Sequence, residues 1–178
     1  MGDPHILVVG GTGMLSGLCE ALTGDGGRLS LLARRASAWG GSAAGRFDCD
    51  YYDEDAFAAA LDAAVGQRGP IELAVTWIHT LKVAAPRLVA ERTAGRMFQV
   101  LGSAAADPQR PQTMDLARAV ADGLPDCRLR QVVLGFKVEN GRSRWLTDAE
   151  ISGGVLDAIQ ADRPLSVIGQ TEPWGARP

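Results

Sequence analysis

Residues 5–18 read HILVVGGTGMLSGL. An apolar run ends in a cluster of glycines, and a periodicity typical of a helix begins directly after it. This order is typical of a buried parallel strand that turns into a helix over the pyrophosphate of a dinucleotide. The free N–H groups and the dipole at the start of such a helix favour negative charge. The segment therefore predicts a strand–turn–helix unit that binds a dinucleotide.

Each glycine of this turn has an expected role. Gly10 can take the backbone of a tight turn, and Gly13, which lacks a Cβ atom, lets the backbone approach the phosphates. Gly17 is expected to let the new helix lie close to the sheet. Thr12 and Met14 complete the part of the turn that we expect to contact the ligand. The alternative is a strand, a turn and a helix that bind no ligand.

The composition is that of a globular protein. The 178 residues are 46% hydrophobic and 22% charged, which suits a single domain over residues 1–178. The net charge of −3 provides no general attraction to nucleic acid or to an anionic membrane. No apolar run has the length of a membrane span, and the three cysteines lack metal-site spacing. We therefore expect a cytoplasmic protein with reduced thiols and without a metal, nucleic-acid or membrane partner.

Strand-like and helix-like segments alternate along the chain. We expect strands at residues 5–10, 28–33, 46–50, 71–78, 96–101, 128–136 and 165–168. We expect helices at residues 14–23, 54–66, from 86 onward, 113–121, and from a capping box at 147 to 161. Short links between such segments indicate a parallel sheet covered on both faces. The predicted fold class is α/β: a Rossmann-like, doubly wound parallel sheet of six to seven strands, with its ligand at the carboxyl ends of the strands.

A hairpin interrupts this alternation near the C-terminal end. Asn140-Gly141 lies between residues 136–139 and 142–145, and this dipeptide is a strong signal for a two-residue turn. Lys137 and Glu139 share one face of the hairpin. They are either polar groups of a pocket or solvated surface residues.

The glycine turn resembles that of a known family. Thr12-Gly13-x-x-x-Gly17 is similar to the T-G-x-x-x-G turn of the short-chain dehydrogenase/reductase family. Residues 132–155, which include GRSRWLT, are similar to the tail of small bacterial proteins labelled as short-chain dehydrogenases. The resemblance implies a Rossmann-type domain that binds a nicotinamide dinucleotide.

The end of the second strand indicates which dinucleotide is bound. An acidic residue here would bond the ribose hydroxyls and repel a 2′-phosphate. This chain has Arg34-Arg35 instead, and its next acidic residue is Asp48. Guanidinium groups favour a 2′-phosphate, so the expected cofactor is NADP rather than NAD. The alternative is that both arginines form a solvated loop.

The resemblance places further cofactor contacts after the third and fourth strands. Asp50 would reach the adenine amino group, and Tyr51 would form a wall, although an aspartate here can also cap the next helix. Thr76, Trp77 and Ile78 stand where the family has N-N-A-G beside the nicotinamide ribose. Backbone contacts of these three residues can persist, whereas asparagine contacts cannot.

The catalytic residues depart most from the family. Ser103 lies within one position of the family's catalytic serine, but it can also be a loop serine that caps its own backbone. The Y-x-x-x-K pair has no counterpart, because the only tyrosines are Tyr51 and Tyr52. Histidines titrate near neutral pH, so His79 is the other candidate proton donor. A structural hydrogen-bonding role is the alternative for His79.

Three functions compete on this sequence. The first is an NADP-dependent oxidoreductase with a divergent active site and an unknown acceptor, for example a quinone. The second is a non-catalytic dinucleotide-binding sensor or regulatory protein, and the third is a structural or interaction domain without nucleotide. We also expect a homo-oligomer that forms contacts through residues 113–121 and 164–178, because symmetric dimers are the commonest assembly.

Overall fold

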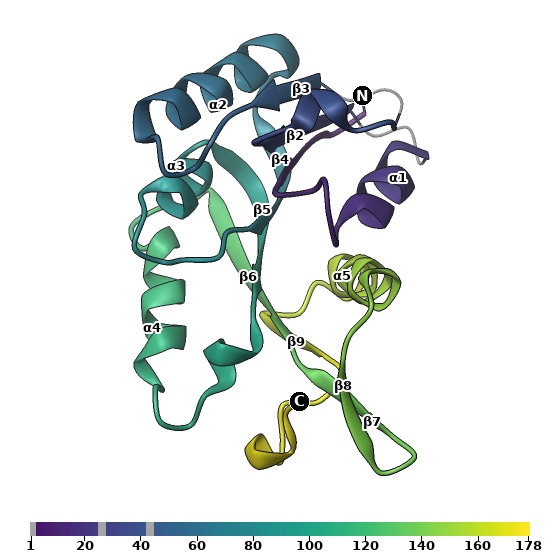
Figure 1. Cartoon of the computed structure of the whole chain (residues 1–178). Coiled ribbons are helices and arrows are strands. Elements are labelled where there is room, and N and C mark those ends of the chain that lie inside the picture. Colours follow the sequence, from purple (N-terminus) through teal and green to yellow (C-terminus); the bar gives the residue numbers. More distant parts are fainter. Residues whose placement is uncertain (1–2, 25–27, 42–44) are drawn as a thin grey trace.

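The computed structural model describes residues 3–24, 28–41 and 45–178. Within these residues, seven parallel strands form one sheet in the order β3-β2-β1-β4-β5-β6-β9, and two further strands pair as an antiparallel hairpin (Figure 1). The predicted fold class is therefore confirmed. The strand order reverses between β1 and β4, and parallel sheets of this kind bind ligands beside such a point.

The elements follow the expected alternation. The strands of the large sheet are β1 (His5–Val9), β2 (Arg28–Ala33), β3 (Gly45–Asp48), β4 (Ile71–Trp77), β5 (Thr93–Leu101), β6 (Cys127–Leu134) and β9 (Leu165–Ile168). The hairpin consists of β7 (Phe136–Glu139) and β8 (Arg142–Trp145). The α-helices are α1 (Ser16–Gly24), α2 (Glu54–Arg68), α3 (Ala85–Glu91), α4 (Gln112–Arg118) and α5 (Asp148–Ala161). Single 3₁₀ turns are η1 (Ala36–Ala38), η2 (Ser103–Ala106), η3 (Ala119–Ala121) and η4 (Trp174–Ala176).

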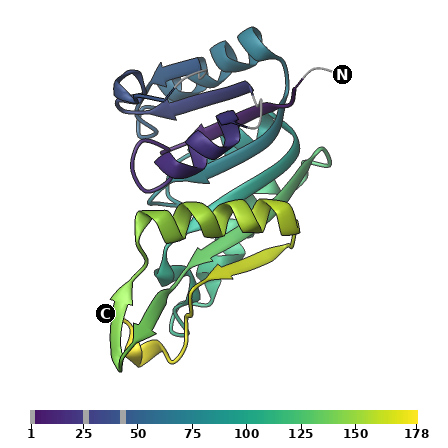
Figure 2. The ribbon, with the colours of Figure 1, turned by 90° about the vertical axis from the view of Figure 1, so that its right-hand side faces the viewer.

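Helices cover both faces of the sheet. Figure 2 shows α1 and α5 side by side on one face, while α2, α3 and α4 lie on the other face in Figure 1. Neighbouring residues of β1 point to opposite faces: Val8 packs in the cluster under α1 and α5, and Leu7 packs in the cluster under α2 and α3. Because both faces are buried, the strand is apolar at each consecutive position from Ile6 to Val9 rather than at alternate ones.

Most elements begin or end one to three residues away from the expected positions. The fifth strand begins at Thr93 instead of Arg96, because Gly95 lets it approach β4 where any Cβ atom would clash with the Glu72 carbonyl. The first helix begins at Ser16, two residues later than expected. The helix expected over 113–121 is the short α4, followed by η3.

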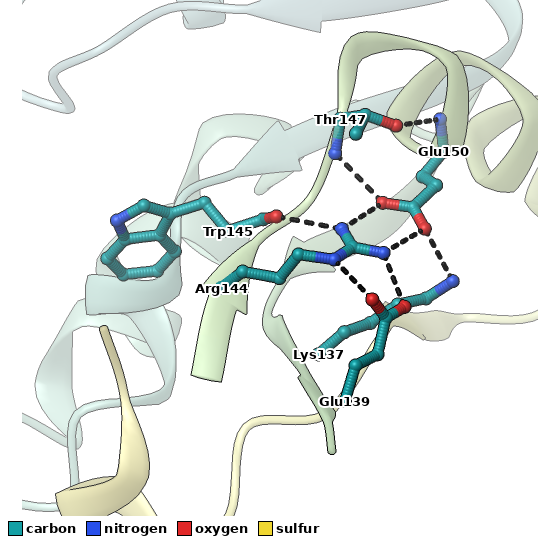
Figure 3. A network of polar contacts seen from close by, with 6 residues as sticks. All are labelled: Lys137, Glu139, Arg144, Trp145, Thr147 and Glu150. Carbon is teal, nitrogen blue, oxygen red and sulfur yellow. Dashed lines mark hydrogen bonds and ion pairs between the residues drawn. The ribbon is translucent and has the colours of Figure 1, made fainter. Parts of the chain in front are cut away.

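An ionic network attaches the hairpin to α5 (Figure 3). The Glu150 carboxylate accepts hydrogen bonds from Lys137 Nζ at 2.6 Å and from two nitrogens of Arg144 at 2.8 and 2.9 Å. Arg144 also donates two bonds to Glu139, at 2.9 and 2.6 Å. Glu150 and Thr147 form the predicted capping box of α5. Lys137 and Glu139 are therefore engaged in this network rather than freely solvated, and the Arg144 guanidinium holds the pKa of Glu150 well below its usual range.

The strand β9 forms one edge of the large sheet. Its Leu165 and Val167 side chains are 46% and 47% exposed. The segment that we expect to contact a second copy therefore presents an open strand edge, and self-association stays a prediction. No helix within the described residues has the length and apolarity needed to cross a membrane.

His5 is a fully buried polar residue at the amino end of β1, a central strand of the sheet. Its Nδ1 atom lies 2.7 Å from the Gly69 carbonyl, and its Nε2 atom lies 2.9 Å from the Ser30 hydroxyl. The carbonyl can only accept, so Nδ1 donates and Nε2 accepts in the neutral imidazole. Burial, with a smaller contribution from the charges of Arg28 and Arg68, lowers the pKa of His5.

We expect the free energy of unfolding to fall as the pH is lowered from 7 to 5. The unfolded chain binds a proton on His5 near pH 6.5, whereas the folded chain binds it only at lower pH, so the unfolded state takes up more protons in this window. His5→Asn should flatten this dependence, and His79→Gln should preserve it. Urea unfolding at several pH values measures the slope, and an unchanged slope in His5→Asn would contradict the assignment.

We expect Arg144→Met to lower the midpoint of thermal unfolding more than Arg142→Met does. The first substitution leaves the Glu139 and Glu150 carboxylates close together without the guanidinium that bridges them. The second removes the same charge from the same strand, but Arg142 has no ion pair within the described residues. Calorimetry on both variants measures the difference, and equal midpoints would show that the network does not hold the hairpin.

Candidate functional site

A cavity of about 600 Å³ lies over the carboxyl ends of β1, β2 and β4. The glycine turn contributes Gly10, Thr12, Gly13 and Met14 to its lining. Arg34 and Arg35, which follow β2, line it as well, and so do Tyr51, Trp77 and His79. The structure thus brings together most of the predicted cofactor-binding residues in one cavity. It lies beside the reversal of strand order, as expected for this class of sheet.

The turn is built around two glycines with different constraints. Gly10 has a φ of +78°, and a Cβ atom there would lie 2.5 Å from the Trp77 carbonyl oxygen. Both its backbone conformation and the proximity of β4 therefore require glycine. A Cβ atom at Gly13 would have no neighbour within 4 Å. Its missing side chain leaves open space in the cavity, as expected for a position that a phosphate approaches.

Gly17 has a different role from the predicted one. A Cβ atom at Gly17 would lie 3.3 Å from Ser152 Oγ, so this glycine brings α1 close to α5 rather than to the sheet. Ser152 Oγ also donates a hydrogen bond of 2.8 Å to the Met14 carbonyl. The helix α5 therefore supports the glycine turn directly. Gly17 itself does not line the cavity.

Sequence reasoning assigned no role to Gly11. A Cβ atom there would lie 2.7–2.8 Å from side-chain atoms of Val8, Cys19 and Leu31, so Gly11 fills a tightly packed point of the core. The consecutive glycines at positions 10 and 11 are visible in the sequence and could have drawn attention to Gly11. Which of the two glycines lines the cavity and which packs in the core depends on the conformation of the folded turn.

Arg34 and Arg35 are exposed and have no ion pair among the residues that the structure describes. The nearest following acid, Asp48, is engaged elsewhere, because it accepts hydrogen bonds from Ser37 N at 2.7 Å and from Ser37 Oγ at 2.6 Å. These bonds lower the pKa of Asp48. Asp48 therefore bonds to Ser37 and forms no ion pair with Arg34 or Arg35.

The residues that follow β3 have different roles. Tyr51 lines the cavity as predicted, whereas Asp50 is not among the residues that line it. Asp50 Oδ1 instead accepts from Tyr52 N at 3.1 Å, and Asp53 caps α2 by accepting from Ala56 N at 3.0 Å. An adenine contact of Asp50 stays a prediction.

Cys49 and Phe57 belong to the same wall of the cavity as Tyr51. Burial, together with the nearby carboxylates of Asp48 and Asp50, raises the pKa of the Cys49 thiol to about 11. The thiol is therefore protonated at neutral pH and forms part of an uncharged wall.

A second cavity, of about 200 Å³, lies between the ends of β4 and β5. Trp77 and His79 line both cavities, and their rings meet edge to face with centroids 4.7 Å apart. Ile78 lines the second cavity, whereas Thr76 is buried within the sheet and lines neither.

The two predicted catalytic residues are in different positions relative to these cavities. His79 is exposed and lies where both cavities meet. Ser103 begins η2 and is half-buried, but it is not part of the lining of either cavity. The geometry therefore places His79, and not Ser103, next to both candidate ligand spaces.

No protein-family model matches this sequence, and no curated protein matches it significantly. Solved structures, however, match along nearly the whole chain. An apo SCOR enzyme from Clostridium thermocellum has a TM-score of 0.70 at 16% identity, over 95% of this chain and 92% of that one.

Two similar structures contain a cofactor. A metagenomic short-chain oxidoreductase in complex with NADP is 21% identical, with a TM-score of 0.67 over 95% of this chain and 97% of that one. A short-chain dehydrogenase from Burkholderia cenocepacia J2315 in complex with NADP is 18% identical, with a TM-score of 0.64 over 96% and 90%. The chain thus has the fold of the short-chain dehydrogenases/reductases.

Proposed function

We propose that this chain binds NADP and is an oxidoreductase with a divergent active site. One observation carries the proposal: a single cavity at the carboxyl ends of the strands contains both the glycine turn and Arg34-Arg35. The glycine turn suits a pyrophosphate, and the two arginines suit a 2′-phosphate. The NADP complexes among structures of the same fold support this reading.

The residues present fit such a cofactor. The backbone of the turn, with open space at Gly13, would hold the pyrophosphate at the start of α1. Arg34 and Arg35 would pair with the 2′-phosphate, and Tyr51 would form a wall for the adenine. The nicotinamide half would then extend toward Trp77 and His79.

A bound nicotinamide supplies a hydride, which carries two electrons. The protein must then provide what the hydride does not, namely a proton for the reduced acceptor and a site that orients it. His79 is suited to donate this proton, because it is exposed to solvent and lies at the junction of the two cavities.

The second candidate is a dinucleotide-binding sensor without catalysis. It is favoured by the composition of α4, which has no tyrosine or lysine where the family carries its catalytic pair. Cofactor consumption separates this candidate from the oxidoreductase. Absence of cofactor binding would favour the third candidate, a structural domain.

We expect tighter binding of NADPH than of NADH. A charge-assisted contact to the 2′-phosphate contributes enough to change the dissociation constant about tenfold. Arg34→Ala should therefore reduce the preference about tenfold, while Arg118→Ala, on the remote α4, should leave it unchanged. Calorimetric titration of both cofactors measures the ratio, and equal affinities in the parent would contradict the assignment of the 2′-phosphate.

We expect Gly13→Val to abolish dinucleotide binding and to preserve the fold. The new side chain has no protein atom in its way, but it occupies the space that the pyrophosphate needs. Gly66→Val is the matched control, because its Cβ atom also meets nothing within 4 Å but lies on α2. Thermal melts and cofactor titrations distinguish the two effects, and full affinity in Gly13→Val would rule out the turn as the binding site.

A further inference from the structure

The second cavity has the size of a single ring. Its volume is about 200 Å³, and a cavity of roughly 150 Å³ is known to accommodate benzene in a protein core. It lies between the loop after β4 and the start of η2, with Thr113 of α4 on its wall.

The lining of the second cavity is uncharged. Ile78, Leu81, Leu101 and Ala105 supply an apolar wall. Among the residues described as lining it, His79 is the one titratable group. The first cavity differs, because Arg34 and Arg35 line it. A carboxylate or phosphate in the second cavity would lose hydration without gaining a permanently charged partner such as arginine or lysine, so an uncharged ligand is favoured.

A few polar groups can orient such a ligand. Thr80 and Thr113 both line the cavity. The Thr80 Oγ1 atom accepts a hydrogen bond from Lys82 N at 3.1 Å, so its hydroxyl hydrogen can be donated to a ligand oxygen. Apolar walls with a small number of polar groups are typical of sites for small molecules.

Trp77 and His79 place the second cavity directly beside the first. The Trp77 backbone lies against Gly10, and its ring atom Cη2 lies 3.7 Å from the Cβ position of Gly102. The indole therefore extends from the glycine turn to the end of β5. A ring bound in the second cavity would therefore lie next to a ligand group bound at the Trp77 and His79 end of the first cavity.

We propose that the second cavity binds one uncharged six-membered ring, and that under the proposed function this ring is the acceptor, of the monocyclic quinone class. The proposal rests on the NADP-dependent function for its redox part only. Reduction of a quinone to a hydroquinone consumes one hydride and one proton. A ring N–H of His79 can donate that proton to a quinone oxygen, and the ring can regain a proton from solvent, since the side chain is exposed.

Binding can be tested without turnover, because the chain has two histidines and only His79 lines the cavity. Benzamide and benzoate have nearly the same size and differ in charge, so they are matched probes. In protein with ¹³C-labelled histidine rings, we expect benzamide to shift the His79 resonance and benzoate to leave it in place. The buried His5 should not respond to either probe and reports that the fold is intact.

Ala104→Leu tests the location of the ring. Ala104 lines the second cavity but is exposed, so a larger side chain can fill part of the cavity without disturbing the core. This variant should lose the benzamide shift and retain NADPH affinity. Ala119→Leu, an equal enlargement at an exposed residue outside the cavity, should retain both. A shift that persists in Ala104→Leu, or an equal response to benzoate, would overturn the proposal.

Turnover tests the acceptor and the proton donor. We expect NADPH to reduce 2,6-dimethyl-1,4-benzoquinone, and His79→Gln to lower kcat about a hundredfold. Failure of NADPH to bind the parent would refute the proposed function, whereas the benzamide shift would still decide whether the cavity binds a ring. Tight NADPH binding together with a benzamide shift, but without quinone reduction, would overturn the acceptor assignment.

Discussion

The hydrogen bond from Ser152 Oγ to the Met14 carbonyl links the candidate site to the C-terminal part of the chain. It joins α5 to the glycine turn, at the same place where Gly17 lets α1 approach α5. The first turn of α5 also contains Glu150, which binds the hairpin through Lys137 and Arg144. One helix therefore supports both the cofactor-type turn and the β7–β8 hairpin, and its position determines how the two are arranged.

The contrast in charge between the two cavities constrains what they can bind. Two arginines line the first cavity, and Asp48, the nearest acid along the chain, is engaged with Ser37. Within the described residues the second cavity is lined by no permanently charged side chain. A phosphate-bearing ligand is therefore favoured in the first cavity and an uncharged one in the second, because desolvation of an unpaired charge is costly. Trp77 and His79 line both cavities, so ligands in the two cavities would lie next to each other.

The differences between the expected and the observed positions of three candidate site residues share one physical cause. Gly17 contacts α5 instead of the sheet, and Asp50 binds its own backbone segment rather than lining the cavity. Ser103 lies close in sequence to the expected catalytic position, but at the start of η2 it is not among the residues that line either cavity, and its catalytic role stays a prediction. In each case the residue type suggested a role, whereas the position of the residue relative to the cavities depended on how neighbouring elements pack.

The sequence by itself determined the features that arise from local interactions. These are the apolar strands buried on two faces, the glycine turn, the Asn140-Gly141 hairpin and the Thr147–Glu150 capping box, since each depends on residues only a few positions apart. The tertiary structure alone decided the long-range contacts. Ser152 and Met14 are 138 positions apart, and His79 lies at the junction of two cavities formed by separate strand ends. Such contacts depend on the packing of whole helices and strands, which no local pattern specifies.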